Sequence, residues 1–230
     1  MLTEEINPFT GDVREETYNE RLNIGYDNVR NQWEEAPAYF DDSTLKICGH
    51  PVMEGWEDNY MKKLAEVATS RQGVVLEVGF GMGISAGYVQ NGNIEKHIII
   101  EANKDVFEKA NGFVSQAKKP VELIFGFWEE AIKQILDGTI SGILFDTYPL
   151  SEAEIHTNHF YFFDEAYRIL KPGGVFTYYS DEIDSFSPGH MAALRKAGFN
   201  KISSEICQVN PPANCQYWKS NTILVPIVTK

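Results

Sequence analysis

The sequence predicts an α/β protein with a doubly wound, mostly parallel sheet of seven strands that includes an antiparallel edge strand. After Gly73, short apolar runs alternate with helical stretches, which is typical of a parallel sheet covered on both faces. A glycine-rich turn at 79–83 directly follows the first apolar run, and the second run ends in Glu101. These two features predict a ligand site at the carboxyl edge of the sheet.

Residues 1–45 form a polar segment that differs from the rest of the chain. They are rich in Glu, Asp and Asn, carry scattered aromatic residues and show no sustained hydrophobic period. We interpret this segment as an arm or lid with short helical pieces, and residues 46–230 as one domain. A helix is expected over 54–69, where two stripes of residues recur at four-residue steps. The stripes are Trp56, Tyr60 and Leu64, and Met53, Glu57 and Met61.

Five short runs rich in β-branched and aromatic residues predict buried strands. They lie at 74–78, 98–100, 123–125, 143–145 and 175–178. Helices are expected between them, near 84–90, 104–117, 129–136 and 158–170. The Lys-Pro-Gly-Gly sequence at 171–174 predicts a sharp turn from helix to strand, because Pro ends a helix and Gly tolerates unusual dihedral angles. A helix near 188–197 and a strand pair near 200–209 and 222–228 complete the fold.

The composition narrows the classes of partner. The chain has 230 residues and a formal net charge of −13, with no basic stripe to offset it. Phosphate backbones and anionic membranes are therefore not expected as partners. Three cysteines (Cys48, Cys207 and Cys215) have no metal-ligand spacing, so no metal site is expected, and reduced thiols fit a cytoplasmic protein. The amino terminus has no signal-peptide pattern, and no apolar run is long enough to span a membrane.

The glycine-rich turn predicts a nucleoside site. Gly79, Gly81 and Gly83 would let the backbone approach a ligand closely, with the N-terminus of a helix near Ile84 above it. Their spacing lacks the later glycine of the dinucleotide fingerprint, so a pyrophosphate is not favoured. Glu101 ends the second predicted strand, where a carboxylate can bind both ribose hydroxyls. An adenosyl cofactor without a pyrophosphate fits this pair of features best.

The sequence resembles class I S-adenosylmethionine-dependent methyltransferases and, within them, the guanidinoacetate N-methyltransferase family. The resemblance runs from about Trp33 to the end of the chain. Its most specific strings are PVMEGWE at 51–57 and DTYPLSE at 146–152, and it also includes VLEVGFGM at 75–82 and the tail 211–230. It implies a Rossmann-like methyltransferase sheet and S-adenosylmethionine as the cofactor.

The resemblance also implies which residues bind the cofactor. Those expected around it are Trp33, Met53, Met61, Glu77, Gly79, Phe80, Gly81, Met82, Gly83, Ile84, Ser85, Glu101, Ala102, Asn103, Trp128 and Glu129. Within this set, Glu101 would bind the ribose, and Trp128 and Glu129 would lie beside the adenine.

Glu57 and Asp146 are the expected catalytic residues, and the resemblance places both at the guanidino group of the substrate, with Tyr148 nearby. A guanidinium holds its proton with a pKa of roughly 12.5–13.8, so its nitrogen is a poor nucleophile. Two carboxylates can bind its N–H groups and fix its plane. Asp146, at the end of the fourth predicted strand, is expected to accept the proton that the nitrogen loses.

One segment departs from the family pattern. Asp181 and Glu182 stand where the family binds a substrate carboxylate through backbone amides. Anionic side chains there would favour a substrate with a positive group. The sequence therefore slightly favours arginine over guanidinoacetate, and both acidic residues are expected to bind substrate.

Three other functions would account for part of the sequence pattern. A small-molecule O-methyltransferase would keep the cofactor motifs without needing the carboxylate pair. A protein arginine methyltransferase shares the chemistry but uses paired glutamates on a different loop, and no such pair is recognised in this sequence. A non-catalytic protein that only binds S-adenosylmethionine would not need Glu57 and Asp146. The sequence leaves open whether the protein is a monomer or a homodimer.

Overall fold

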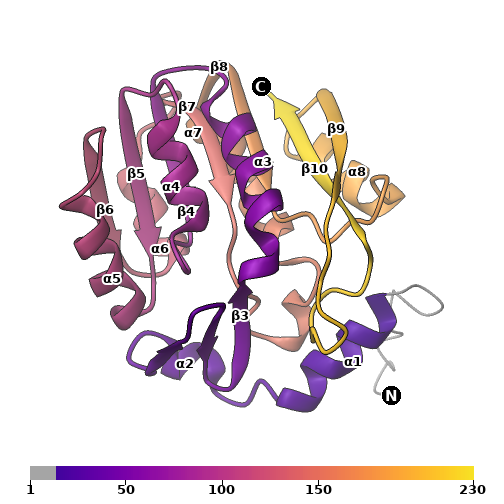
Figure 1. Ribbon diagram of the computed structural model, residues 1–230. Coiled ribbons are helices and arrows are strands. Elements are labelled where there is room, and N and C mark those ends of the chain that lie inside the picture. Colours follow the sequence, from indigo (N-terminus) through magenta and orange to yellow (C-terminus); the bar gives the residue numbers. More distant parts are fainter. Residues whose placement is uncertain (1–13) are drawn as a thin grey trace.

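The computed structural model describes residues 14–230, so the first part of the predicted arm, 1–13, lies outside the described residues. Its main sheet has seven strands in the order β6-β5-β4-β7-β8-β10-β9 (Figure 1). Neighbours from β6 to β8 are parallel, and β10 runs antiparallel to both β8 and β9. The strands are β4 (Val74–Val78), β5 (Lys96–Glu101), β6 (Val121–Phe125), β7 (Ile140–Phe145), β8 (Leu170–Tyr178), β9 (Lys201–Gln208) and β10 (Thr222–Thr229). The predicted fold class is confirmed, with the antiparallel strand one place in from the edge.

Helices cover both faces of this sheet and form two apolar clusters. The helices are α3 (Asp58–Thr69), α4 (Ile84–Asn91), α5 (Lys104–Val114), α6 (Trp128–Ala131), α7 (Phe163–Ile169) and α8 (Pro188–Lys196). Val75 packs in the cluster that contains residues of α3, α4 and α5, whereas Leu76 packs in the one that contains residues of α6, α7 and α8. Successive side chains of a strand point to opposite faces, so β4 contributes to both clusters.

The predicted arm holds more regular structure than the sequence indicates. It contains α1 (Arg14–Ile24) and α2 (Val29–Trp33), followed by a small antiparallel sheet of β1 (Ala38–Phe40), β2 (Thr44–Ile47) and β3 (His50–Glu54). The sequence does not predict this small sheet, because its strands are only 3 to 5 residues long. The predicted boundary after residue 45 falls inside β2, so the small sheet includes residues from both sides of it.

Three predicted helices are wrong in extent. The segment 54–69 is not one helix, since β3 ends at Glu54, a 3₁₀ turn covers Gly55–Glu57 and α3 begins at Asp58. Met53 therefore lies on a strand and shares no helix stripe with Glu57. The predicted helices 129–136 and 158–170 are each split into an α-helical part and a 3₁₀ turn, Ile132–Gln134 and Asn158–Phe162 respectively. Another 3₁₀ turn, Glu152–Glu154, precedes the latter.

The arm lies at the edge of the main sheet where the parallel strands end. In Figure 1 the arrowheads of β5 and β7 point towards the indigo segment that carries α1, α2 and β3. Asn103, just after β5, donates from its side chain to the carbonyls of Trp33 and Ala36 at 2.7 and 2.8 Å. The carbonyl of Glu34 accepts from the Lys104 amide at 2.9 Å. These bonds hold α2 across the carboxyl edge. Within residues 14–230, no helix is both long and apolar enough to span a membrane.

Gly142 allows the sheet to pack directly on α3. A Cβ at this position of β7 would lie 1.8 Å from the Ala68 carbonyl oxygen. We expect Gly142→Ala to lower the free energy of unfolding by about 1–3 kcal/mol, because a helix backbone must shift to admit the methyl group. Urea unfolding checks this. Gly112→Ala is the control, since nothing lies within 4 Å of that site on α5. It should raise stability by about 0.5–1 kcal/mol. Equal effects of the two substitutions would contradict the packing argument.

Candidate functional site

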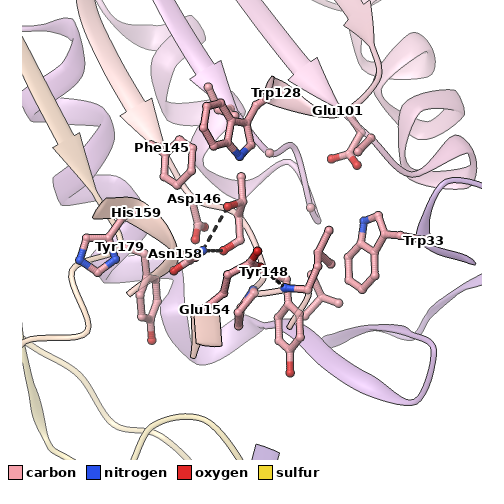
Figure 2. A pocket seen from close by; sticks show the side chains of 18 of the residues that line it. Trp33, Glu101, Trp128, Phe145, Asp146, Tyr148, Glu154, Asn158, His159 and Tyr179 are labelled. Atoms are coloured by element: carbon pink, nitrogen blue, oxygen red, sulfur yellow. Dashed lines mark hydrogen bonds between the residues drawn. The ribbon is translucent and has the colours of Figure 1, made fainter. Parts of the chain in front are cut away.

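A cavity of about 370 Å³ lies between the carboxyl edge of the main sheet and the arm. Residues after β4, β5 and β7 line one wall, and Arg21, Arg30 and Trp33 of the arm line the other. In the view of Figure 2, Glu101 and Trp33 lie on one side, His159 and Tyr179 on the other, and Asp146 between them. The cavity therefore has two parts, one beside the glycine-rich turn and one beside the end of β7.

The glycine-rich turn lies close to the residues around it. A Cβ at Gly79 would lie 2.0 Å from the Asp146 carbonyl oxygen, and φ there is +90°. A Cβ at Gly81 would lie 3.0 Å from the sulfur of Met53. The Gly83 Cα lies against the ring of Phe80, which would be 2.7 Å from a Cβ. Only glycine lets this turn pack so closely against its neighbours.

Glu101 ends β5 and lines the glycine-rich part of the cavity. Its carboxylate accepts hydrogen bonds from the backbone amides of Phe80 at 2.9 Å and Asn103 at 2.7 Å. Burial raises the pKa of Glu101, and these amides partly offset that effect. A carboxylate fixed by backbone donors still has free lone pairs, so it can accept from the two hydroxyls of a ribose.

Aromatic side chains enclose this part of the cavity. Trp33 stacks on Tyr148 with ring centroids 5.8 Å apart and an interplanar angle of 9°. Trp128 lines the cavity from α6. Arg30 of α2 pairs with Glu129 of α6 at 2.6 Å and closes the arm onto the domain. Flat apolar surfaces beside a ribose-binding carboxylate suit a purine ring.

Glu57 is buried in the second part of the cavity, at the end of the 3₁₀ turn that precedes α3. Its Oε1 accepts hydrogen bonds from the Tyr217 hydroxyl at 2.6 Å and from the Glu54 amide at 2.8 Å. Both bonds reach the same oxygen, which leaves Oε2 for a ligand. Burial, followed by the negative charge of Asp146, raises the pKa of Glu57 to about 8.

Asp146 follows β7 directly and also lines the cavity (Figure 2). Among residues 14–230, no side chain or amide donates a hydrogen bond to its carboxylate. Burial, followed by the charges of Glu77 and Asp181, raises the pKa of Asp146 to about 7. A carboxylate without a donor in a buried cavity is costly to ionise unless a cation binds. Two such carboxylates in one cavity can together accept hydrogen bonds from a planar cation with several N–H groups.

Several predicted cofactor residues do not line the cavity. They are Met61, Glu77, Phe80, Met82, Gly83, Ile84, Ser85 and Asn103. Glu77 faces the interior of the domain, where Ser85 donates to its Oε1 and His97 Nε2 lies 2.8 Å from its Oε2. Asn103 instead caps α5 by accepting from the Val106 amide at 3.1 Å. These residues shape the walls behind the cavity, and the sequence pattern alone could not separate them from the lining.

The remaining predicted residues do line the cavity. They are Trp33, Met53, Glu57, Gly79, Gly81, Glu101, Ala102, Trp128, Glu129, Asp146, Tyr148 and Asp181.

The acidic segment after β8 is not the free anionic surface that the sequence predicts. Glu182 does not line the cavity. Its carboxylate accepts from Arg14 at 2.9 Å and lies 3.0 Å from His190 Nδ1. Asp181 lines the cavity, but its Oδ1 lies 2.6 Å from His156 Nδ1. Although burial opposes the effect, His156 and then Arg21 lower the pKa of Asp181 to about 2. Glu182 therefore has partners within the chain and lies outside the lining, whereas Asp181 remains an ionised group of the lining that already contacts His156.

Other residues of the site have no motif of their own in the sequence. Tyr217 holds Glu57, and Tyr179 and Arg21 line the same part of the cavity. Asn158 donates to the carbonyl of Thr147 at 2.6 Å and so fixes the loop after β7 (Figure 2). Tyr217 lies in the tail 211–230 that the family resemblance covers, and that was the one available signal. Arg21 precedes the resembling part of the chain.

Comparisons with known sequences find methyltransferases. A family model described as guanidinoacetate N-methyltransferase matches residues 22–230. The chain is 31% identical over 191 residues to protein arginine N-methyltransferase 2 of Yarrowia lipolytica, which covers 77% of this chain and 39% of the relative. It is 33% identical over 136 residues to the protein of the same name of Candida glabrata, covering 56% and 32%. The chain thus spans less than half the length of these relatives.

Solved structures show the same fold. A spermidine synthase in complex with a transition-state analogue matches with a TM-score of 0.61 and 17% identity, covering 84% of this chain and 72% of that one. TYW2 of M. jannaschii in complex with AdoMet matches with a TM-score of 0.55 and 14% identity, covering 85% of each chain. At such identities the likeness concerns the fold alone.

The buried carboxylates predict how stability without ligands depends on pH. The pKa of Asp146 rises from 3.8 to about 7 on folding. A carboxyl group whose pKa is raised by folding contributes stability that is fully present below its unfolded pKa. This stability is lost as pH rises through the folded pKa. We expect Asp146→Asn to be more stable than wild type by about 1–2 kcal/mol at pH 8, and the gain to vanish near pH 4.

Urea unfolding at both pH values, without cofactor, measures this difference. Buried histidines titrate alike in both proteins, so their effect cancels. The exposed Asp42 provides the control, and Asp42→Asn should show no such pH-dependent gain. A gain for Asp146→Asn that is the same at pH 4 and pH 8 would contradict the assignment.

Proposed function

Because the chain belongs to the guanidinoacetate N-methyltransferase family, we propose that it methylates a guanidino nitrogen of a small guanidino acid. It is a methyltransferase, and its cofactor is S-adenosylmethionine. The observation that carries the proposal is the pair of buried carboxylates, Glu57 and Asp146, which line one cavity and both have raised pKa values.

The cavity fits the cofactor. Gly79 and Gly81 line it in a turn packed tightly against Asp146 and Met53, Glu101 offers a fixed carboxylate, and Trp33 and Trp128 provide flat surfaces. Glu101 would hold the ribose, and the two tryptophans would enclose the nucleoside. S-adenosylmethionine supplies an electrophilic methyl group on a positively charged sulfur. The residues of the chain then have to orient the acceptor nitrogen and take its proton.

The two carboxylates perform these tasks together. Their raised pKa values mean that the empty site retains protons near neutral pH. An entering guanidinium lowers both pKa values and releases those protons, because opposite charges now favour the ionised forms. Glu57, fixed by Tyr217, orients the guanidinium plane. Asp146, which has no competing donor, accepts the proton that the nitrogen loses as its lone pair forms the bond to the methyl carbon.

The partners of Asp181 and Glu182 bear on the choice between guanidino substrates. Asp181 and Glu182 are already paired with His156 and with Arg14 and His190. The acidic segment therefore does not decide between guanidinoacetate and arginine, and both are candidates, with the names of the curated relatives pointing to arginine chemistry. Arginine remains a member of the same class, since it carries both a guanidino group and a carboxylate.

Methylation of an arginine side chain in a protein is the second candidate. The curated relatives named protein arginine N-methyltransferase 2 favour it. That class is expected to use paired glutamates. Glu57 and Asp146 offer two carboxylates in the same way. The position of the arm favours small molecules instead, because α1 and α2 cover the cavity and contribute Arg21 and Trp33 to its lining. A peptide would have to displace them.

We propose that the arm acts as a lid. The partly exposed pair between Arg30 and Glu129 and the bonds from Asn103 to the carbonyls of Trp33 and Ala36 hold α2 against the domain. Opening them would admit ligands, and closing them would exclude water from the carboxylates and strengthen their contacts with a cation.

We also propose a cytoplasmic location and a monomer or homodimer that binds neither nucleic acid nor membranes. The acidic composition argues against binding to nucleic acids and membranes, and three free thiols support the cytoplasmic location.

A substrate panel tests the proposal. Guanidinoacetate, arginine, agmatine and an arginine-containing peptide would each be incubated with cofactor, and the product identified by mass. We expect turnover of the guanidino acids. Asp146→Asn should keep cofactor affinity in calorimetry but lose about 10²–10⁴ in turnover, because the amide cannot accept the proton. Asp164→Asn, at an exposed site on α7, is the control. Turnover of the peptide alone would select the second candidate, and near-wild-type turnover by Asp146→Asn would remove its assigned role.

The cofactor site generates a separate prediction. Glu101→Gln should weaken binding of S-adenosylmethionine by about 1–3 kcal/mol, because charged hydrogen bonds become neutral ones. The turnover at saturating cofactor should change little. Glu95→Gln, at an exposed position just before β5, is the matched control and should leave affinity unaltered. If Glu101→Gln lowered only the saturated rate, the residue would have another task.

A further inference from the structure

Arg21 is a buried cation in the cavity lining that the proposed mechanism does not use. It lies on α1 in the arm, and only 4% of its surface is exposed. Burying a guanidinium is costly unless its charge and its N–H groups are met by partners. The contacts of Arg21 therefore indicate whether it is a structural residue or a ligand-binding one.

Its guanidinium has few partners among residues 14–230. Of the five N–H donors of an arginine, one is accepted: Nη2 donates to the Tyr217 carbonyl at 3.4 Å. The buried Nε has no acceptor. The nearest carboxylate oxygen, Asp181 Oδ1, is 3.9 Å away and lies 2.6 Å from His156. Asp181 thus supplies charge but no hydrogen bond, and most donors of Arg21 are left for another acceptor.

Two aromatic rings flank the guanidinium and fix its position. Its central carbon lies 5.7 Å from the ring centroid of Tyr148 and 5.6 Å from that of Tyr217. The hydroxyl of Tyr217 donates to Glu57. One side chain therefore contacts both the cation Arg21 and a member of the carboxylate pair. Positive and negative groups line the same part of the cavity within a short distance of each other.

We propose that Arg21 binds the carboxylate of a short guanidino acid while Glu57 and Asp146 bind its guanidinium. This inference rests on the proposed function and adds to it the residue that selects for an acidic group. The planar fork of an arginine matches the two oxygens of a carboxylate, which explains why several donors lack partners in the protein itself. The opposite charges in the cavity complement a zwitterion better than a substrate that is only cationic.

The position of Arg21 on the arm gives the substrate a second effect. A carboxylate held by Arg21 and a guanidinium held by Asp146 would connect α1 to the end of β7. The substrate would thus stabilise the closed arm, and a guanidino compound without a carboxylate would not.

The test compares guanidinoacetate with ethylguanidine, which has a similar shape but lacks the carboxylate. We expect Arg21→Gln to lower kcat/KM for guanidinoacetate about 10- to 100-fold, the range for a hydrogen-bonded charged group. The loss should appear mainly in KM and in calorimetric binding of guanidinoacetate. Ethylguanidine should react at an unchanged kcat/KM. Arg21→Lys should recover part of the binding, because it keeps the charge but not the fork.

Arg14→Gln is the matched control, since Arg14 lies on the same helix and binds the same acidic segment but does not line the cavity. It should leave the ratio of the two substrates unaltered. Equal losses for guanidinoacetate and ethylguanidine in Arg21→Gln would make Arg21 a structural counter-ion and overturn the inference. If wild type methylated neither compound, the proposed function itself would fail. Calorimetric binding of guanidinoacetate to wild type and to Arg21→Gln would still test Arg21 in that case, and equal affinities would refute its role.

Discussion

The site depends on keeping two carboxylates, Glu57 and Asp146, in one buried cavity. Burial and neighbouring negative charges raise the pKa values of both carboxylates. Without a ligand, both therefore keep their protons at pH values where Asp and Glu ordinarily ionise. The protein tolerates this arrangement because rigid elements determine both positions. Asp146 ends a strand buried on both faces, and Glu57 is fixed by the Tyr217 hydroxyl and the Glu54 amide. A bound cation removes the repulsion, which makes ligand binding and proton release one event.

The arm completes this site by supplying charges of the opposite sign. Arg14 and Arg21 face the acidic segment after β8, and their helix carries Thr17 to within 3.2 Å of His156. The acidic segment thus serves to bind α1. A protein with a formal net charge of −13 places these cations where carboxylates converge. The interactions that dock the arm and those that would hold a substrate are therefore adjacent, and Arg21 belongs to both groups.

The sequence was sufficient for the sheet, because buried parallel strands and glycine turns leave a strong pattern. It also placed Glu57, Glu101 and Asp146 at the cavity, since two of them end strands at the carboxyl edge. It failed where contacts join distant segments. His156 lies 25 residues from its partner Asp181 in the sequence, and Arg14 lies 168 residues from its partner Glu182. No local sequence pattern indicates such pairs, so two acids that have partners in the fold look free in the sequence.

The same limit explains the errors around residues 50–57. Four-residue spacing of Met53, Glu57 and Met61 predicts a helix, but β3 pairs with β2 through Glu54 and ends the regular period there. The chain then turns through Gly55, whose amide donates to the Ser43 carbonyl at 2.7 Å. At this helix start Glu54 and Glu57 form a capping box, in which the Glu54 amide donates to Oε1 of Glu57. Inside a continuous helix that amide would donate to a backbone carbonyl one turn earlier instead. The departure from helical geometry is thus what aims Glu57 at the cavity, and the misassigned segment is the one on which the site depends.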